Sequence, residues 1–253
     1  MKTTLIIPDV QHPLEDKVML KKVIKVAREI QPDHILQGGD LIDLPQVSRW
    51  SQGTALQYAQ TLQEHIDGLV TSFFEPLRDA CPDAKFTWLE GNHDARLEDF
   101  IQKYAPALAP LRALELKSLL RLDEFSVEYV RGPHRIATNT YAVHGHEAGG
   151  YCSSQSAWDV KFQKRYGSDK SFVFFHTHQP FLITRAFGYD GRVSPRFTMN
   201  VGSIMDPVKA TYVKDGAVSW TMSFAIIRDD GKRVYPELIT AVDRGFYWNG
   251  RKY

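Results

Sequence analysis

The sequence has little cysteine, little net charge and no long apolar run. Two of its 253 residues are cysteines, Cys81 and Cys152, and they form no CxxC pair. This excludes a disulfide-stapled fold and indicates reduced thiols in a cytoplasmic protein. Lysine and arginine number 31 against 30 acidic residues. The chain therefore lacks the basic excess of proteins that bind long nucleic acids, and no stable nucleic-acid complex is expected.

Membrane-spanning segments are missing as well. No stretch approaches the ~18 consecutive apolar residues that a spanning helix needs. The apolar run Leu5–Ile7 is followed directly by Pro8 and Asp9, which makes it too short for the core of a signal peptide. Hydrophobic residues make up 43% of the chain, and we find no repeat or linker. We therefore expect one domain over residues 1–253 with no membrane association.

The first half of the chain alternates strands with helices. Short buried strands are expected at residues 3–8, 34–37 and 85–89, and helical sequence at 18–30, 54–80 and 96–122. This alternation indicates a parallel α/β core.

The second half is rich in short β runs with one helical interval at residues 155–166. The predicted strands are 126–130, 140–144, 171–175, 181–187, 196–201, 218–228 and 233–240. Two mixed sheets packed face to face, with helices on the outside, accommodate all of these elements. The predicted fold class is therefore α/β, a four-layer α/β/β/α sandwich.

Potential metal ligands recur at or just after the ends of the predicted strands. They are Asp9, Asp40, Asn92, His144, His176 and His178. In open α/β sheets, ligand sites form beyond the carboxyl ends of the strands. Carboxylate, amide and imidazole donors without thiolate suit Mn, Fe or Zn. Two such ions ~3.5–4 Å apart hold the attacking and leaving oxygens of an in-line displacement.

These residues occur in motifs that resemble the calcineurin-like metallophosphoesterase family, whose ordered motifs are DxH, GDxxD, GNH[DE], a lone His and GHxH. Here they read Asp9-Val10-Gln11, Gly39-Asp40-Leu41-Ile42-Asp43, Gly91-Asn92-His93-Asp94, His144-Gly145 and His176-Thr177-His178. Asn200-Val201-Gly202-Ser203 is similar to the family's NPGS turn. The resemblance covers about residues 3–205.

The resemblance implies a role for each position. Asp40 would bridge two divalent ions. Asp9, Gln11 and His178 would hold the first ion, and Asn92, His144 and His176 the second. His93 would face the substrate and protonate the leaving oxygen, with Asp94 orienting it. A hydroxide activated by the two ions would be the nucleophile.

The sequence departs from the family pattern at two positions. Gln11 replaces the usual first-motif histidine, and an amide oxygen is a harder ligand that favours Mn or Mg. His12 follows directly, and we leave open whether Gln11 or His12 completes the first site. Phe175 replaces the glycine before the HxH motif, which leaves both histidines in place.

Several residues allow a structural interpretation as well as a functional one. Asp40 and Asn92 would also serve as helix caps. Either His144 or His146 would supply the lone-His ligand; we favour His144 and place His146 near the substrate. Arg96 would lie on a helix surface or contact a phosphate oxygen.

Three further histidines and the adjacent residues Arg49 and Trp50 carry weaker signals. Arg49 and Trp50 would pack against the protein or line a base or aryl pocket. His34, His65 and His134 have no motif around them and are interpreted as surface or packing residues.

The leading hypothesis is a dimetal phosphodiesterase acting on a cyclic nucleotide or another small diester. Manganese is the favoured metal, with Fe, Zn, Ni or Mg as alternatives. A nuclease of the same family acting on single-stranded DNA or RNA, a phosphomonoesterase and a non-catalytic scaffold are the competing hypotheses. The substrate and the oligomeric state are not encoded in any motif.

Overall fold

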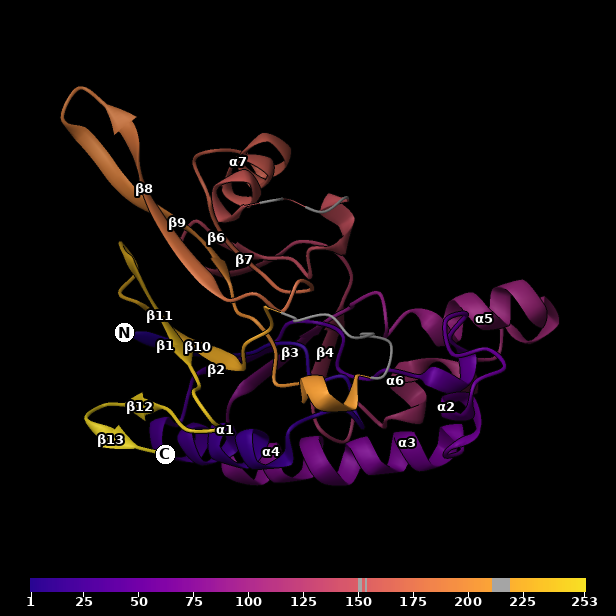
Figure 1. Ribbon diagram of the computed structural model, residues 1–253. Coiled ribbons are helices and arrows are strands. Elements are labelled where there is room, and N and C mark those ends of the chain that lie inside the picture. Colours follow the sequence, from indigo (N-terminus) through magenta and orange to yellow (C-terminus); the bar gives the residue numbers. More distant parts are fainter. Residues whose placement is uncertain (150–151, 153, 211–218) are drawn as a thin grey trace.

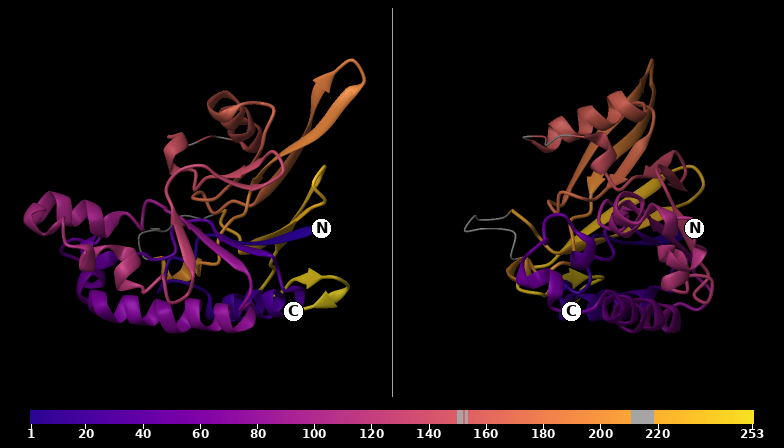
Figure 2. Two further views of the ribbon diagram at one scale, coloured as in Figure 1. Left: turned by 180° about the vertical axis from the view of Figure 1, so that it is seen from behind. Right: turned by 90° about the vertical axis from the view of Figure 1, so that its right-hand side faces the viewer.

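Two β-sheets lie face to face between helices in the computed structural model, which describes residues 1–149, 152, 154–210 and 219–253. Figure 1 places α1 (Lys17–Ile30), α3 (Leu62–Leu69) and α4 (Glu75–Ala80) below the first sheet, and the second sheet with α7 (Gln155–Tyr166) above it. Figure 2 shows the same layers from behind and from one side. The predicted sandwich of two mixed sheets flanked by helices is confirmed.

The first sheet has six strands in the order β11-β10-β1-β2-β3-β4. Its strands are β1 (Lys2–Ile7), β2 (His34–Gln37), β3 (Lys85–Leu89), β4 (Val127–Val130), β10 (Ser223–Asp229) and β11 (Val234–Thr240). The strands β1 to β4 run parallel, whereas β10 and β11 are antiparallel to their neighbours. The carboxyl ends of β1, β2 and β3 therefore lie at one edge, which is where parallel sheets place their ligands.

The strand β1 shows how the two faces of this sheet are used. Leu5 and Ile7 pack among the helices of the lower layer, whereas Ile6 packs between the two sheets with Val173 and Phe175. Because successive side chains of a strand point to opposite faces, one fully buried apolar run serves both cores.

The second sheet has five strands in the order β5-β6-β7-β9-β8. They are β5 (His134–Ala137), β6 (Thr140–Ala142), β7 (Ser171–Phe174), β8 (Phe181–Tyr189) and β9 (Arg192–Asn200). The strands β6, β7 and β9 are parallel to one another, so the segments after β6 and β7 leave the sheet at the same edge. The hairpin β8–β9 extends beyond the rest of the molecule (Figure 1).

The helical region predicted at residues 54–80 is divided into several pieces. It contains α2 (Ala55–Tyr58), α3, a π-helical turn at Val70–Phe74 and α4. Pro76 lies in the first turn of α4 and has no N–H to donate to the preceding turn. The wider π-turn just before it accommodates this missing donor.

The helix predicted at residues 96–122 is wrong in its length. The helix α5 covers only Arg96–Tyr104, and short turns connect it to α6 (Leu116–Leu119). Pro106 and Pro110 lie in this connection, and proline interrupts the hydrogen bonds of a helix.

The remaining elements are short. They are the 3-10 turns η1 (Pro45–Val47), η3 (Pro106–Leu108), η4 (Arg112–Leu114), η5 (His146–Ala148) and η6 (Pro207–Lys209), and the hairpin strands β12 (Tyr247–Trp248) and β13 (Arg251–Lys252). Residue 218, where one predicted strand began, lies outside the described residues. None of the described helices has the length and apolar character that crossing a bilayer requires.

Candidate dimetal centre

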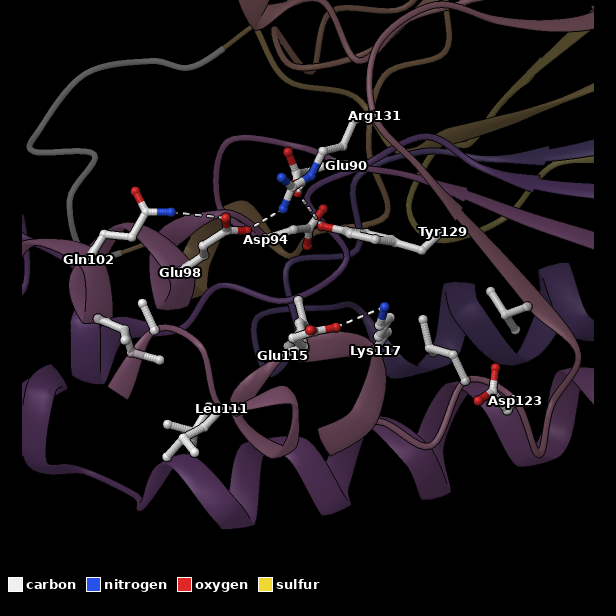
Figure 3. Close-up of a pocket in the computed structure, with 16 residues that line it drawn as sticks. Glu90, Asp94, Glu98, Gln102, Leu111, Glu115, Lys117, Asp123, Tyr129 and Arg131 are labelled. Carbon is white, nitrogen blue, oxygen red and sulfur yellow. Dashed lines mark hydrogen bonds and ion pairs between the residues drawn. The ribbon is translucent and has the colours of Figure 1, made fainter. Parts of the chain in front are cut away.

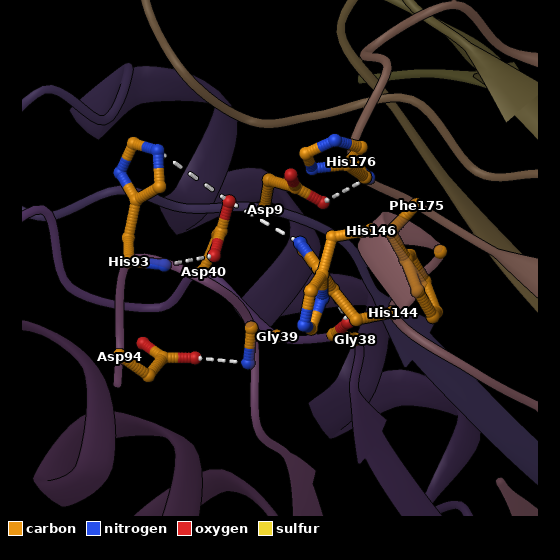
Figure 4. A network of polar contacts seen from close by, with 12 residues as sticks. Asp9, Gly38, Gly39, Asp40, His93, Asp94, His144, His146, Phe175 and His176 are labelled. Carbon is orange, nitrogen blue, oxygen red and sulfur yellow. Dashed lines mark hydrogen bonds and ion pairs between the residues drawn. The ribbon is translucent and has the colours of Figure 1, made fainter. Parts of the chain in front are cut away.

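The predicted ligands meet at the edge of the two sheets where β1, β2, β3, β6 and β7 end. Each ligand lies on the loop that follows one of these strands: Asp9 after β1, Asp40 after β2, Asn92 after β3, His144 after β6, and His176 and His178 after β7. Figure 4 shows His93, His144 and His176 around the carboxylate of Asp40. The topology thus brings residues from five segments to one place.

Asp40, His144 and His176 form one half of the site. Their potential ligand atoms all lie within 4.8 Å of one another. His144 Nε2 is 3.2 Å from Asp40 Oδ2, yet it makes no hydrogen bond among the described residues. The two atoms therefore lie side by side, as two ligands of one ion do. His144 Nδ1 lies 2.9 Å from the carbonyl oxygen of Gly38, an arrangement that leaves Nε2 available.

Two glycines allow this close approach. A Cβ atom on Gly39 would lie 2.4 Å from His144 Nδ1, and one on Gly91 would lie 2.2 Å from the backbone N and Oδ1 of Asp40. Gly39 also has a φ of +98°, which side-chain-bearing residues rarely adopt. The glycines of the GD and GN motifs are therefore required by packing around Asp40.

Asp9 and His178 form the other half of the site. His178 Nε2 is 3.0 Å from Asp9 Oδ2, and both residues are buried. Gln11 Nε2 is 3.5 Å from His178 Nε2, so Gln11 reaches this half-site. His12 instead contacts Glu15, with Nδ1 3.2 Å from Oε2. The structure therefore places Gln11, and not His12, beside the first metal position.

Four of the site residues have a left-handed backbone. The φ angles are 49° at Gln11, 48° at Asp40, 70° at His176 and 58° at His178. The alternation of side chains along a strand does not apply to His176 and His178, because β7 ends at Phe174. His176 faces His144, with ring centroids 5.3 Å apart, whereas His178 faces Asp9.

The charged groups around Asp40 shift one another's pKa values. Burial opposes ionisation of Asp40, but attraction from His144 and His93 outweighs it and lowers the pKa of Asp40 well below its usual value. Burial likewise opposes protonation of His144, yet Asp40 raises the pKa of His144 to about 10. Burial and the nearby His144 lower the pKa of His176 to about 4. The ionised carboxylate and the neutral His176 are in the states that bind metal.

The donor set fits a pair of divalent ions. Asn92 Oδ1 is buried and has no hydrogen-bond partner among the described residues, which suits an oxygen that belongs to an ion. Asp40, Asn92, His144 and His176 would hold one ion, and Asp9, Asp40, Gln11 and His178 the other. These are N and O donors without thiolate, as Mn, Fe and Zn accept.

His93 lies beside the metal positions without joining either ligand set. Its backbone N–H donates to Asp40 Oδ1 at 2.7 Å, and its Nε2 is 3.7 Å from Asp40 Oδ2. Its Nδ1 is 2.7 Å from Asp43 Oδ1. Burial lowers the pKa of His93, but Asp40 and Asp43 outweigh it, and the net effect is a raised pKa. This geometry suits a residue that carries a proton next to the ions.

Comparison with known proteins decides the family. The model of the calcineurin-like phosphoesterase family matches residues 2–200. The chain belongs to this family. It is 33% identical over 251 residues to the gene 54 protein of Mycobacterium phage L5, covering 99% of this chain and 98% of that protein. It is 32% identical over 250 residues to the gene 54 protein of Mycobacterium phage D29, covering 98% and 97%.

Solved structures are more distantly similar. A single mutant of Vps29 from Entamoeba histolytica aligns with 13% identity and a TM-score of 0.49, covering 97% of this chain and 96% of that chain. The YfcE phosphoesterase from E. coli aligns with 14% identity and a TM-score of 0.42, covering 89% and 88%. The family match, and not these alignments, identifies the protein as a metal-dependent phosphoesterase.

Asp43 is a residue of the site whose contact with His93 the sequence did not predict. It contacts His93 and also accepts from Arg96 Nη1 at 3.0 Å, while Arg96 Nη2 lies 3.0 Å from His93 Nε2. Arg96 is therefore held at the site and is not a free surface residue. Asp43 ends the GDxxD motif, and this was the one signal that marked it.

Asp94 does not orient His93, which corrects that expectation. Its carboxylate accepts hydrogen bonds from the backbone N–H groups of Leu41, Ile42 and Gly91 and from Trp88 Nε1. Figure 4 shows it apart from the His93 ring. Burial and Asp40 raise the pKa of Asp94 to about 7. Asp94 thus ties the Asp40 loop to the Asn92 loop.

An acidic cavity of about 580 Å³ lies behind Asp94. Figure 3 shows Glu90 and Glu98 on its wall, joined by Arg131, with Tyr129 donating to Glu90 at 2.8 Å. The cavity is separated from the metal ligands by Asp94, and its carboxylates disfavour a phosphate there.

Two smaller features complete the site. The Phe175 ring lies where a Cβ on Gly38 would be, with Cε1 2.3 Å away, so the substitution before the HxH motif packs into the core between the sheets. His146 lies beside His144 and His176, with ring centroids 5.3 and 6.2 Å apart. It lines a cavity next to His176, a position compatible with the predicted contact to substrate.

Proposed function

We propose that this phosphoesterase is a phosphodiesterase that hydrolyses a cyclic nucleotide or another small diester. The observation that carries this proposal is a cavity on each side of the metal ligands. One, of about 450 Å³, is lined by His146, His176 and Trp220. The other, of about 430 Å³, is lined by Asn92 and Arg96. A diester carries two substituents, and each cavity is large enough for one of them.

The protein's own residues have distinct parts in this reaction. When bound, the two ions supply Lewis acidity and lower the pKa of water. His93 Nε2 lies 3.0 Å from Arg96 Nη2 and, because a guanidinium only donates, it accepts there; in the protonated ring it would carry the proton for the leaving oxygen. Asp43 accepts from Nδ1 and favours the protonated ring. Arg96 lies close enough to His93 to contact the phosphate of a bound substrate.

The test compares two substrates in Mn. Turnover of bis(p-nitrophenyl) phosphate is expected to exceed that of p-nitrophenyl phosphate, because a monoester leaves one cavity without a substituent. The His93→Ala variant should keep its metal and lose turnover by roughly 10²–10⁴. Faster monoester cleavage would contradict the diester preference, and metal loss in His93→Ala would contradict the role given to His93.

A nuclease acting on single strands is the second candidate. It is favoured by Arg49, Arg96 and Lys103, three cations that line the cavity beside Asn92, because basic grooves follow a nucleic-acid backbone. Degradation of labelled single-stranded DNA or RNA faster than of a dinucleotide would favour this candidate over a small-diester enzyme.

The metal and the compartment belong to the same proposal. Gln11 in the first half-site supports Mn or Mg as the native metal, since an amide oxygen is a harder donor than imidazole. Cys81 and Cys152 are free thiols, which supports a place in the reducing cytoplasm. A nucleotide or other small phosphodiester is the proposed partner, with no stable nucleic-acid complex.

A further inference from the structure

The cavity beside Asn92 extends away from the metal centre between two segments. One wall is formed by η1 and the residues after it up to Gln57 on α2, and the other by α5. Figure 1 shows α2 and α5 together at one end of the molecule. The cavity begins at a metal ligand, Asn92, and at Arg96, which contacts His93. A group bound in it would therefore be attached to the phosphate at the metal ions.

The wall formed by α5 is a single helical face. Arg96, Asp99, Phe100, Lys103 and Tyr104 all line the cavity, and their spacing of three or four residues places them on one side of the helix. The Phe100 and Tyr104 rings lie 4.9 Å apart, and Lys103 Nζ is 4.9 Å from the Tyr104 ring. The helix buries only Leu97 fully, so this face is available to a ligand.

Trp50 stands on the opposite wall. It is 73% exposed, which is unusual for an indole ring beside a catalytic site. Arg49 Cζ lies 4.6 Å from the Trp50 ring and covers one of its faces. An aromatic base would stack on the other face of the Trp50 ring, which Arg49 leaves uncovered. Gln52 and Asp99, which also line the cavity, provide an amide and an acceptor for the edge of such a base.

The charges of this cavity select a phosphate-bearing ligand. Arg49, Arg96 and Lys103 line it, and Asp99 is the one acid among its described lining residues. The cavity behind Asp94 is instead dominated by carboxylates. The cavity beside His146 has aromatic rings but no lysine, arginine or carboxylate among its described lining residues. Aromatic surface and positive charge coincide in the cavity next to Asn92.

We propose that this cavity, bounded by Trp50 and by the Phe100 face of α5, is a nucleobase subsite. The substrate would be a nucleotide diester whose base stacks on Trp50 while its phosphate lies at Asn92 and Arg96. This inference rests on the proposed phosphodiesterase function. It deepens that function by naming the substituent that one of the two cavities accepts.

The test measures binding as well as turnover. Equilibrium binding of AMP and of ribose 5-phosphate to the Mn-loaded protein is compared by calorimetry, because ribose 5-phosphate keeps the sugar and phosphate and has a hydroxyl in place of the base. AMP is expected to bind at least about tenfold more tightly, the ratio typical of one stacked base. Trp50→Ala should remove most of this ratio by weakening AMP alone, whereas Trp50→Phe, which keeps a ring, should retain most of it.

Tyr58→Ala is the matched control. Tyr58 is an equally exposed aromatic on α2, at 76%, but it is not among the residues lining the cavity. This variant should bind both probes as the wild type does. Equal binding of AMP and ribose 5-phosphate to the wild type, or an equal loss of both in Trp50→Ala, would overturn the subsite.

Hydrolysis of methyl p-nitrophenyl phosphate separates the two proposals. This diester has no base, so its turnover reports on the phosphodiesterase function alone. Turnover without a preference for AMP would refute the nucleobase subsite and leave the enzyme proposal intact. A preference for AMP in a metal-loaded protein that hydrolyses no diester would refute the enzyme proposal and leave the subsite intact.

Discussion

Asp43→Asn is expected to impair the proton transfer by His93 while leaving the metal centre loaded. Asp43 is buried, and its Oδ1 lies 2.7 Å from His93 Nδ1 and 3.0 Å from Arg96 Nη1. Bound ions would take up the charge of Asp40, so Asp43 is the remaining carboxylate that favours protonated His93. Burial opposes ionisation of Asp43, but His93 and Arg96 lower its pKa, so it is charged at neutral pH.

The size of the effect follows from that contact. A hydrogen bond to a charged group contributes about 1.5–3 kcal/mol, and one pKa unit corresponds to about 1.4 kcal/mol. Replacing the carboxylate by a neutral amide should therefore lower the pKa of His93 by roughly one to two units. The alkaline limb of the pH–rate profile should move to lower pH by the same amount.

The assay uses two diesters that differ only in their leaving group. Methyl phenyl phosphate needs a proton on its leaving oxygen, whereas p-nitrophenolate departs with little assistance. At pH 8 in Mn, Asp43→Asn should lose about 10–100-fold of kcat on the phenyl ester and much less on the p-nitrophenyl ester. Asp67→Asn removes an exposed acid on α3 whose carboxylate accepts from Gln63 alone among the described residues, and it serves as the control for net charge.

The reasoning would be refuted if Asp43→Asn slowed both esters equally at every pH. Loss of metal from the variant, measured by inductively coupled plasma mass spectrometry, would instead show that Asp43 supports the ions and not His93. An unchanged thermal unfolding midpoint would confirm that a slow variant is correctly folded.

Two further predictions address metal binding and acid stability. Asp40→Asn should lose both ions together with activity, because its carboxylate is placed to be shared; full metal occupancy in that variant would disprove bridging. His34 has a pKa lowered to about 4 from 6.5 by burial and by Lys85, so the unfolded chain takes up its proton first and stability falls as pH drops from 6.5 towards 4. The free energy of unfolding is measured by urea titration in EDTA at pH 7 and at pH 4.5. Between these two pH values, it should fall by about 2–3 kcal/mol less in His34→Gln than in the wild type. An equal fall in both proteins would disprove the role of His34.

The sequence predicted which segments meet at the site because strand ends determine it. Once β1, β2 and β3 are recognised as parallel neighbours, Asp9, Asp40 and Asn92 must leave the sheet at the same edge. The boundaries of α7 were likewise readable from its pattern, since Ser154 caps its first turn and Gly167 follows its last. These features depend on local sequence alone.

The pairing of side chains across the site depends on contacts that local sequence does not contain. Asp94 adjoins His93 in the chain and so was assigned as its partner, but its carboxylate is engaged by the backbone of residues 41, 42 and 91. Asp43 is fifty residues away in the chain and is the residue that contacts the ring. Only the packing of the loop after β2 against the loop after β3 brings the two together.

Four predicted ligands have a left-handed backbone, and the fold must hold them in this conformation; they are Gln11, Asp40, His176 and His178. This conformation costs roughly 1–2 kcal/mol for a residue with a side chain, a notable sum against a total stability of about 5–15 kcal/mol. The surrounding contacts must therefore hold these loops in place. Asn200 Nδ2 donates to the carbonyl oxygen of Phe175, just before His176, and to Thr177 Oγ1, between the two histidines, at 3.1 and 2.8 Å.

Such strain is characteristic of functional sites, where the rest of the structure maintains it. Strand alternation would have directed His176 and His178 to one side and into one half-site. The two left-handed turns direct them to His144 and to Asp9 instead, so a segment of three residues serves both metal positions. The HxH spacing alone therefore predicts which residues would hold the ions, and the backbone turns decide which half of the site each of them faces.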